Sequence, residues 1–588
     1  MKGGGGGGIG AGGPAAHHQM GDPDDYKKKN ASGGRRFIWD YLLLGLRAML
    51  LTAVLLFAAY AVYFLQLFPT YCRHYYPHRR HQTSPEDEGI LNDAVLRATI
   101  GLATSASAGN DTSLSRPPSR LQQLSTAPQG EGIDAPTGSP PLSVRPRSPS
   151  SEMATSLRHI VFGIAASAKL WDKRKEYIKV WWRPREMRGC VWLDNTVKTP
   201  RGEQGLLPRI RISADTSKFP YTHRGGHRSA IRISRIVSET IRNLPAGASE
   251  VRWLVMGDDD TVFFPDNLLR VLSKYDYRQP YYIGAVSESH LQNIYFSYGM
   301  AYGGGGFAIS RPLAEALTRM QDRCIARYPA LYGSDDRMQA CMAELGVPLT
   351  REPGFHQYDV YGSLFGLLAA HPVAPLVSIH HLDVVEPVFP GETRVSALRK
   401  LFQGPVRLDS GGVMQQSICY DVNSRSGRKW TVAVSWGYAV QVVRGVMSPR
   451  EVETPTRTFL NWYRRADYTA YSFNTRPVAR SPCQKPFVFY FASAATANNA
   501  TEGRGATTTV TYYARYRREA KHPACKWKIE EPSTVERVVV YKRADPHLWD
   551  RAPRRNCCRV RPRKKGDRTM TIDVGLCRDG EISQPQQP

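Results

Sequence analysis

Three adjacent aspartates, Asp258, Asp259 and Asp260, end an apolar stretch at 253–257, and a second apolar stretch follows them. Like charges this close make one another harder to ionise, so the pattern predicts a positive partner. In an extended chain Asp258 and Asp260 face one side, and Asp259 faces the other. Two converging carboxylates suit Mn²⁺ or Mg²⁺, which prefer oxygen ligands and often share them with a phosphate. The alternative is an acidic turn that caps a helix predicted at 265–272.

A run of glycines at 303–306 lies between an aromatic stretch and a predicted helix. Its central residues, Gly304 and Gly305, would let the backbone approach a ligand closely, although a flexible loop would have the same composition. The run is not followed by the Gly-Lys-Ser/Thr of a P-loop, and the chain has no dinucleotide-binding fingerprint. These absences exclude two common nucleotide sites.

Two further groups of residues are able to take part in chemistry. Asp335 and Asp336 follow Ser334 at the start of a helix predicted from its apolar spacing, so one can cap the helix while the other acts as a general base. His380 and His381 end the stretch LVSI at 376–379. A histidine pair is structural unless a metal lies nearby, in which case it supplies ligands.

The elements that must position these residues alternate between strands and helices. Periodicity predicts strands at 158–167, 189–194 and 251–257, and helices at 171–182 and 227–244. Alternation of this kind predicts a parallel, helix-covered sheet whose ligands gather at the carboxyl ends of the strands, where the aspartates stand. Beyond about 402, short alternating runs predict a second, β-rich region of antiparallel hairpins, at 417–422, 429–443, 486–494, 507–516, 535–543 and 569–577.

The stretch 48–68 carries no charged residue and is long enough to cross a bilayer of ~30 Å. A buried core helix and a cleaved signal peptide are the alternatives, the latter because Ala59 and Ala61 form a small-x-small pair. That pair lies inside the apolar run, and some forty residues precede it, so we expect an uncleaved signal-anchor. Basic residues are more numerous before the stretch than shortly after it, which predicts a cytosolic N-terminus and a luminal main part.

The chain has a formal net charge of +27, which suits nucleic acid, anionic membrane or a polyanionic substrate. A luminal location excludes nucleic acid as the partner. Of the ten cysteines, nine follow Cys72, and no C-x-x-C pair suggests zinc. We expect several disulfides, with at least one of those nine thiols unpaired.

Composition divides the chain into five parts. We predict a cytoplasmic low-complexity tail at 1–47, the transmembrane signal-anchor at 48–68 and a disordered Ser/Pro-rich stalk at 69–154. A catalytic domain at 155–400 and the β-rich region at 401–588 follow.

The order of these motifs resembles that of Fringe-like glycosyltransferases, inverting enzymes that form β1,3 linkages. The resemblance rests on an apolar strand running into DDD, the segment GGGGFAIS, an acidic pair at a helix start and a late Ser-x-His-His. It covers about 155–395, and in the plant branch of the family, known as Fringe-related proteins of unknown function, it extends to about 510. The combination of motifs carries the resemblance, since no single one is specific.

The resemblance implies an α/β, GT-A-like (Rossmann-like) catalytic domain that uses a UDP-sugar donor and Mn²⁺ (or Mg²⁺). It implies that Asp258, Asp259 and Asp260 bind the metal and the donor diphosphate, with Asp260 the strongest metal ligand, and that Gly304 and Gly305 lie at the donor. The base would be in the acidic pair, where we prefer Asp336 to Asp335. A late histidine would complete the metal site. The family has Phe-His-x-His there and this chain has IHHL at 379–382, so His380 and His381 both remain candidates, with His356 as a third.

We therefore expect a single-pass type II protein of the Golgi membrane that acts on a glycan or glycoprotein acceptor. The alternative is a catalytically silent, membrane-tethered sugar-binding or scaffold protein. A binder has no need of a general base beside a metal site, and this difference separates the two hypotheses.

Overall fold

The computed structural model describes residues 154–581, except 204, 246–247, 465–466, 498–507, 517–524 and 565, together with residues 50, 52, 56 and 57. The chain divides into two compact units, and all the elements below belong to the larger one, which contains Arg147–Pro588. The predicted tail, the stalk and most of the predicted anchor at 48–68 lie outside the described residues. Among the described residues, none of the helices combines the length and apolar character that a bilayer crossing requires.

The first sheet in the described part has seven strands in the order β3-β2-β1-β4-β7-β6-β8. The parallel sheet predicted from sequence is present in β3, β2, β1 and β4, but β7 runs antiparallel to β4 and β6. Gly306, with φ +84°, precedes β7, and Phe307 pairs with Met256 so that the chain returns along β4. The strands are β1 Ile160–Ala165, β2 Arg188–Leu193, β3 Arg209–Ile212, β4 Trp253–Asp258, β6 Tyr282–Gly284, β7 Phe307–Ser310 and β8 Leu349–Arg351.

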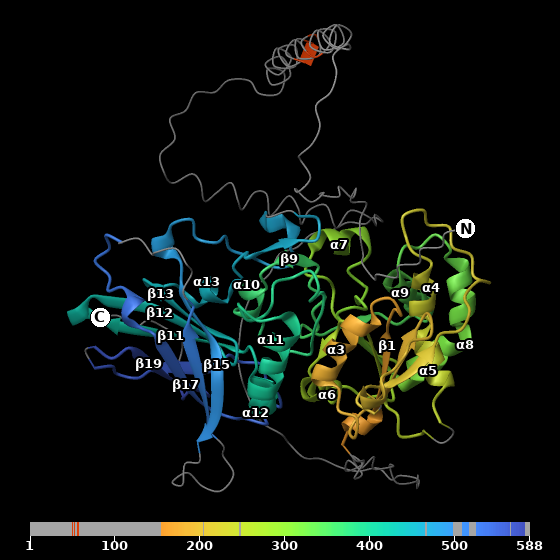
Figure 1. The fold of residues 1–588 in the computed structure, drawn as a ribbon, viewed down its shortest axis with the longest axis horizontal. Coiled ribbons are helices and arrows are strands. Elements are labelled where there is room, and N and C mark those ends of the chain that lie inside the picture. The colour runs from red at the N-terminus through yellow and green to blue at the C-terminus, as the bar shows by residue number, and fades with distance from the viewer. Residues whose placement is uncertain are drawn as a thin grey trace, which may run out of the picture. The chain divides into compact units, whose positions relative to one another are not determined.

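Helices cover both faces of this sheet because alternate residues of β1 point to opposite sides. Phe162 and its same-face neighbours share a core with α3 (Trp171–Trp181) and α6 (Pro265–Leu272). Val161 and Ala165 belong to a second core, which includes residues of α4 Ser229–Ser234, α5 Ile236–Arg242, α8 Arg311–Arg327 and α9 Ser334–Glu344. Figure 1 shows these helices beside β1. The helix predicted at 227–244 is thus two helices, α4 and α5, that meet at Arg235.

The second sheet has eight strands in the described part, in the order β11-β12-β13-β15-β16-β17-β19-β18. Its neighbours are antiparallel, as predicted, except that β17 and β19 run parallel. The run predicted at 429–443 is a hairpin that turns at Gly437, whose φ is +75°. The strands are β11 Gln416–Asn423, β12 Arg428–Ser435, β13 Ala439–Arg444, β15 Phe487–Ala497, β16 Thr508–Arg515, β17 Arg537–Arg543, β18 Cys557–Val560 and β19 Thr569–Gly575.

The two sheets share one hydrophobic core, which includes Phe162 and Leu268 from the first part and Trp430 and Val540 from the second. Short strand pairs join distant segments: β5 (Val262–Phe263) with β10 (Ser378–Ile379), and β9 (Val360–Gly362) with β14 (Phe459–Asn461). The β5–β10 pair matters for the site because its register, Ile379 opposite Val262, brings the residue after β10 beside the aspartates before β5. The remaining α-helices described here are α7 His290–Tyr295, α10 Phe365–Leu368, α11 Arg394–Leu401, α12 Arg407–Asp409 and α13 Pro449–Glu453.

Four disulfides confirm the expectation of several bridges: Cys324–Cys341, Cys419–Cys558, Cys483–Cys525 and Cys557–Cys577. Among the described cysteines this leaves Cys190 as a free thiol, in agreement with the odd count. Cys72 lies outside the described residues.

Candidate active site

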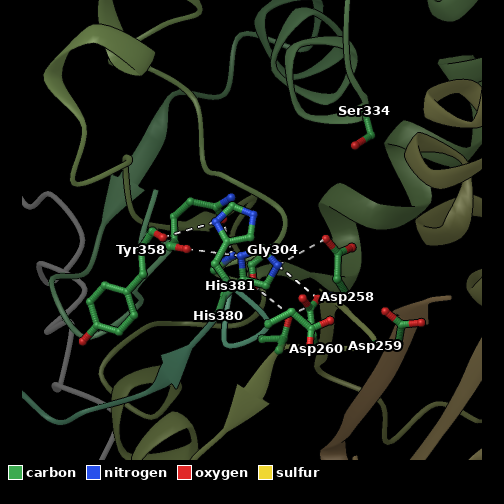
Figure 2. A network of polar contacts seen from close by, with 12 residues as sticks. Asp258, Asp259, Asp260, Gly304, Ser334, Tyr358, His380 and His381 are labelled. Carbon is green, nitrogen blue, oxygen red and sulfur yellow. Dashed lines mark hydrogen bonds and ion pairs between the residues drawn. The ribbon is translucent and has the colours of Figure 1, made fainter. Parts of the chain in front are cut away.

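Asp258, Asp260 and His380 form a buried cluster where β4, β5 and β10 meet. The Nε2 atom of His380 lies 3.2 Å from Oδ1 of Asp260 and 3.8 Å from Oδ2 of Asp258. The ligand atoms of the three residues all lie within 4.8 Å of one another. Figure 2 shows the imidazole of His380 directed at both carboxylates. The arrangement offers two oxygen donors and one nitrogen donor to a single point.

The chemistry of this cluster fits a divalent cation. Oδ1 of Asp260 and Nε2 of His380 are buried, and neither has a hydrogen-bond partner among the described residues. Buried polar atoms normally have hydrogen-bond partners, so a carboxylate oxygen and an imidazole nitrogen that face each other without one indicate a missing partner. Burial also lowers the pKa of His380, which keeps the imidazole neutral, as metal binding requires.

Repulsion within the acidic triplet is visible in the pKa of Asp258. Burial, and then the charges of Asp260, Asp335 and Asp259, raise this pKa well above its usual range. Burial would also raise the pKa of Asp260, but His380 and Arg174 lower it below its usual range. Since a bound cation would favour the ionised form of both carboxylates, it would relieve the cost of keeping them together.

Arg174 on α3 supplies part of the positive charge that the triplet needs. Its guanidinium lies 2.9 Å from Asp259, 3.0 Å from Asp260 and 3.1 Å from Asp383. Asp259 points away from the cation cluster, as predicted, since its carboxylate meets Arg174 and the backbone N–H of Ser167, although Asp259 and Asp260 lie in a turn and not in the extended chain on which the prediction was based. Burial raises the pKa of Asp259 to about 7 although Arg174 opposes the shift. Arg174 thus holds the second oxygen of Asp260 while the first faces His380.

His381 lies outside the cluster. Its backbone is in the left-handed region, with φ +55°, and its Nδ1 is 3.2 Å from both Asp359 and the carbonyl oxygen of Tyr358. Its ring stacks on Trp462, with centroids 4.8 Å apart. The structure therefore places His380, one of the two candidate histidines, at Asp258 and Asp260. His381 instead contacts Asp359 and Trp462 beside the cluster. The third candidate, His356, bonds Glu288 and His371 instead.

The glycine run makes room for the site. A Cβ atom on Gly304 would lie 2.1 Å from the ring of His380, and one on Gly303 would lie 2.6 Å from Oδ1 of Asp335. The backbone N–H of Gly305 donates to Oε1 of Gln357 at 2.6 Å. Two consecutive glycines therefore lie against His380 on one side and a carboxylate of the acidic pair on the other. The expected contact of Gly304 and Gly305 with a donor stays a prediction.

The two aspartates of the acidic pair have different surroundings. Asp336 accepts hydrogen bonds from the backbone N–H groups of Tyr332 (2.7 Å) and Gly333 (2.9 Å), so it caps α9. Asp335 lies against Gly303 and lines, with Asp258, a small cavity of about 20 Å³. Burial raises the pKa of Asp335 to about 6 despite hydrogen bonds from Gly303 and Ser334. The sequence led us to prefer Asp336 as the base, but these positions favour Asp335.

His371, His356 and Glu288 form a buried chain of hydrogen bonds next to the site, and their contacts assign a proton to each of them. Nδ1 of His371 lies 2.8 Å from the carbonyl oxygen of Pro372, so it carries the proton and Nε2 accepts from His356 at 2.9 Å. Nδ1 of His356 must then accept, at 2.9 Å, from the carboxyl group of Glu288. Burial raises the pKa of Glu288 to about 8 and lowers that of His356 to about 3, which agrees with a protonated Glu288 and a neutral ring.

This network predicts a pH dependence of stability that Glu288→Gln removes. Because the pKa of Glu288 is higher in the folded chain than its ordinary 4.5, its contribution is full below pH 4.5 and is lost as the pH rises through about 8. Glutamine keeps both the donor to His356 and the acceptor for the N–H of Tyr358. Between pH 5 and 8 the free energy of unfolding of the variant should therefore rise relative to that of the wild type by up to about 1.4 kcal/mol per pH unit. Thermal midpoints of the two proteins across this pH range measure the difference. Parallel pH curves for the two proteins would contradict the assignment.

Comparisons with known proteins match the segments that carry most of these residues. The model of the family described as Fringe-like matches residues 215–361, inside the range of the resemblance, and includes the aspartates, glycines and acidic pair. A second model, described as protein of unknown function DUF604, matches residues 292–558, which reach from the first sheet into the second.

Two curated relatives are named beta-1,3-glucosyltransferase. The human protein is 34% identical over 116 residues, which are 20% of this chain and 22% of the human protein. The mouse protein is 35% identical over 109 residues, which are 18% of this chain and 21% of the mouse protein. The chain thus spans about a fifth of the length of these relatives. Among solved structures, the mannosyltransferase PcManGT from Pyrobaculum calidifontis, in complex with GDP-Man and Mn²⁺, covers 38% of this chain and 65% of its own, with 13% identity and a TM-score of 0.19.

The Fringe-like match spans the strand that ends in the aspartates, the glycine run and the acidic pair, which are three of the four features that carry the resemblance, whereas the late Ser-x-His-His at 378–381 lies outside it. This chain therefore contains a Fringe-like region at residues 215–361 and is similar, over part of its length, to proteins named beta-1,3-glucosyltransferase.

Proposed function

We propose that this protein transfers a sugar from a UDP-sugar to a hydroxyl of a glycan or glycoprotein acceptor, with inversion and formation of a β1,3 linkage. The observation that carries the proposal is the buried cluster of Asp258, Asp260 and His380 beside the carboxylate of Asp335.

The residues divide into metal ligands and the groups that orient them. Asp258, Asp260 and His380 would hold Mn²⁺, or Mg²⁺ in its place. When bound, the ion supplies Lewis-acid stabilisation of the charge that develops on the leaving diphosphate. Arg174 keeps one oxygen of Asp260 occupied, so that the other stays directed at His380.

Asp335 would act as the general base. As the acceptor oxygen bonds to the anomeric carbon, the bond from that carbon to the diphosphate oxygen breaks, and Asp335 accepts the hydroxyl proton. A pKa of about 6 leaves this carboxylate mostly ionised at neutral pH yet more basic than an ordinary aspartate. Because a single carboxylate assists the attack, the displacement occurs in one step and inverts the anomeric centre.

We further propose that the protein is anchored in the Golgi membrane by the apolar stretch 48–68, with the folded part in the lumen. The four disulfides support an oxidising compartment. The positive charge that the sequence carries would then face glycans or the anionic membrane surface.

Donor hydrolysis and transfer by the purified full chain test this proposal. We expect UDP release from one or a few of the common UDP-sugars that requires Mn²⁺, stops with EDTA and returns when Mn²⁺ is restored in excess. Release that is unaffected by EDTA would contradict the role of the cluster. Absence of release with every donor, together with retained glycan binding, would instead support a catalytically silent binder.

A further inference from the structure

A second cavity, of about 1630 Å³, lies over strands β13, β15 and β16 of the second sheet. None of the residues that line it belongs to the cluster of Asp258, Asp260, His380 and Asp335, so it is separate from the candidate active site. Pockets for small molecules usually measure ~300–1,000 Å³. This cavity is large enough for a ligand of several sugar units.

Arg444, at the end of β13, is the most informative residue in the cavity lining. Its side chain is 2% exposed, and its Nε and Nη2 atoms are buried without a hydrogen-bond partner among the described residues. The carboxylate of Glu531 lies 3.9 Å from Nη2, an ion-pair distance but too long for a hydrogen bond. Nε and Nη2 form one edge of the guanidinium, which binds a carboxylate with two parallel hydrogen bonds. That edge has an ion pair with Glu531 but no hydrogen bond among the described residues, and an anionic ligand would supply the two hydrogen bonds that are missing.

Two other basic side chains in the lining are held by neutral groups, while Arg515 lies 4.0 Å from the carboxylate of Glu536. Arg457 donates to the hydroxyl of Thr475 at 3.0 Å, and Arg476 donates to the carbonyl oxygen of Thr454 at 3.0 Å. The lining contains more basic than acidic residues. The basic ones are Arg444, Arg457, Arg476, Lys485 and Arg515, and the acidic ones are Glu386, Glu451 and Glu536. The cavity is therefore electrostatically suited to an anion.

Aromatic side chains make this an unusual site for a simple anion. Trp527 is 39% exposed and Tyr516 is 43% exposed, and both line the cavity. The guanidinium of Arg444 lies 5.2 Å from the Trp527 ring, so the charged edge and the aromatic face are adjacent. Exposed aromatic faces pack against the C–H faces of sugar rings, whereas an acidic peptide needs only the charges. The combination favours a saccharide that carries a carboxylate.

A disulfide fixes two walls of the cavity. Cys483 lies between the lining residues Pro482 and Gln484, and its partner Cys525 lies two residues before Trp527. The bridge ties the segment that carries Trp527 to the segment that leads into β15. A preformed cavity loses less conformational entropy when a ligand binds.

We propose that this cavity binds an acidic oligosaccharide, with a uronic acid carboxylate on the Nε–Nη2 edge of Arg444 and a sugar ring against Trp527. The site is independent of the transfer chemistry proposed above. It gives the second sheet a glycan-binding role in the same chain.

Calorimetric titration of the purified full chain tests this site. The probe is a galacturonic acid oligosaccharide, compared with the galactose oligosaccharide obtained by reducing its carboxyl groups. We expect the acidic probe to bind at least tenfold more tightly than the neutral one. Arg444→Gln should weaken binding of the acidic probe by about ten- to a hundredfold, so that its affinity comes close to that of the neutral probe. Trp527→Ala, at a partly exposed position, should weaken both probes.

Matched variants separate the site from general charge. Arg561→Gln removes one positive charge from an exposed pair with Asp573 and should leave binding unchanged. Glu531→Gln should strengthen binding of the acidic probe because it removes the carboxylate that competes for Arg444. Unchanged acidic binding in both Arg444→Gln and Trp527→Ala, or no binding of either probe, would overturn the proposal. Equal binding of a polyglutamate peptide would overturn the saccharide assignment. Loss of UDP release would not affect these titrations, so the two proposals fail separately.

Discussion

Replacing Asp335 by asparagine is expected to reduce sugar transfer by about 10²- to 10⁴-fold while Mn²⁺-dependent binding of the donor stays within a few-fold of the wild type. Asparagine has nearly the same shape but cannot accept the acceptor proton. It can still accept the hydrogen bonds from Gly303 and Ser334, so the position of the side chain should be kept. The measurement is the single-turnover transfer rate beside calorimetric donor affinity.

Asp336→Asn is the matched control because it changes the adjacent carboxylate of the same helix. The oxygens of Asp336 cap α9, so weakening the cap should lower the free energy of unfolding by about 0.5–2 kcal/mol. Transfer per folded molecule should stay within a few-fold of the wild type. If the Asp336 variant lost transfer and the Asp335 variant kept it, the base would be Asp336, the residue that the sequence alone favoured.

Replacing Asp260 by alanine is expected to weaken Mn²⁺-dependent binding of UDP by about a hundredfold or more. Asp260 supplies the carboxylate oxygen nearest to Nε2 of His380, and without it the cluster keeps one carboxylate and one imidazole. Changes to groups that only support metal ligands already cost about 10- to 100-fold in affinity. Calorimetry of UDP binding with and without Mn²⁺ measures the effect.

The Asp260 variant should remain folded. Arg174 keeps its contacts with Asp259 and Asp383, and the loss of one carboxylate reduces repulsion with Asp258. The thermal midpoint should therefore not fall below that of the wild type in the absence of metal. Asp573→Ala, which removes a carboxylate from an exposed pair with Arg561, controls for the loss of one negative charge. Unchanged UDP affinity in Mn²⁺ for Asp260→Ala would remove Asp260 from the metal site.

Features that depend on local periodicity could be predicted from the sequence. The predicted division of the triplet is present, with Asp258 and Asp260 facing the cluster and Asp259 facing Arg174, but its cause is not strand alternation. Asp259 and Asp260 lie in a turn after β4, closed by a hydrogen bond from the N–H of Thr261 to the carbonyl oxygen of Asp258. The apolar stretch before His380 forms β10, and its pairing with β5 places that histidine at the aspartates. The family resemblance, rather than periodicity, supplied the expectation that these distant segments meet.

Arg174 was missed, although a signal for it was present. The residues Trp171, Ile178 and Trp181 are buried on α3, and position 174 falls on the same face of a 3.6-residue helix. A charged residue on a buried face requires a partner, so the spacing alone pointed to a nearby carboxylate. The helix was predicted, but a carboxylate partner for Arg174 was not.

Other features depend on tertiary contacts that local patterns do not encode. Which aspartate of the acidic pair caps α9 depends on how the chain approaches through Tyr332 and Gly333. The left-handed backbone of His381, which turns its ring to Asp359 and Trp462, is held by residues from separate segments. The antiparallel direction of β7 likewise follows from the return of the chain beside β4.

The proposed transfer depends on a divalent ion held between Asp258, Asp260 and His380. Anomalous diffraction at the manganese edge, from crystals of the protein grown with MnCl₂ and UDP, tests it most directly. We expect one anomalous peak within bonding distance of a carboxylate oxygen of Asp260 and of Nε2 of His380, with the diphosphate of UDP on its open side. A map without that peak, in which UDP is bound and His380 still faces Asp260 directly, would contradict it.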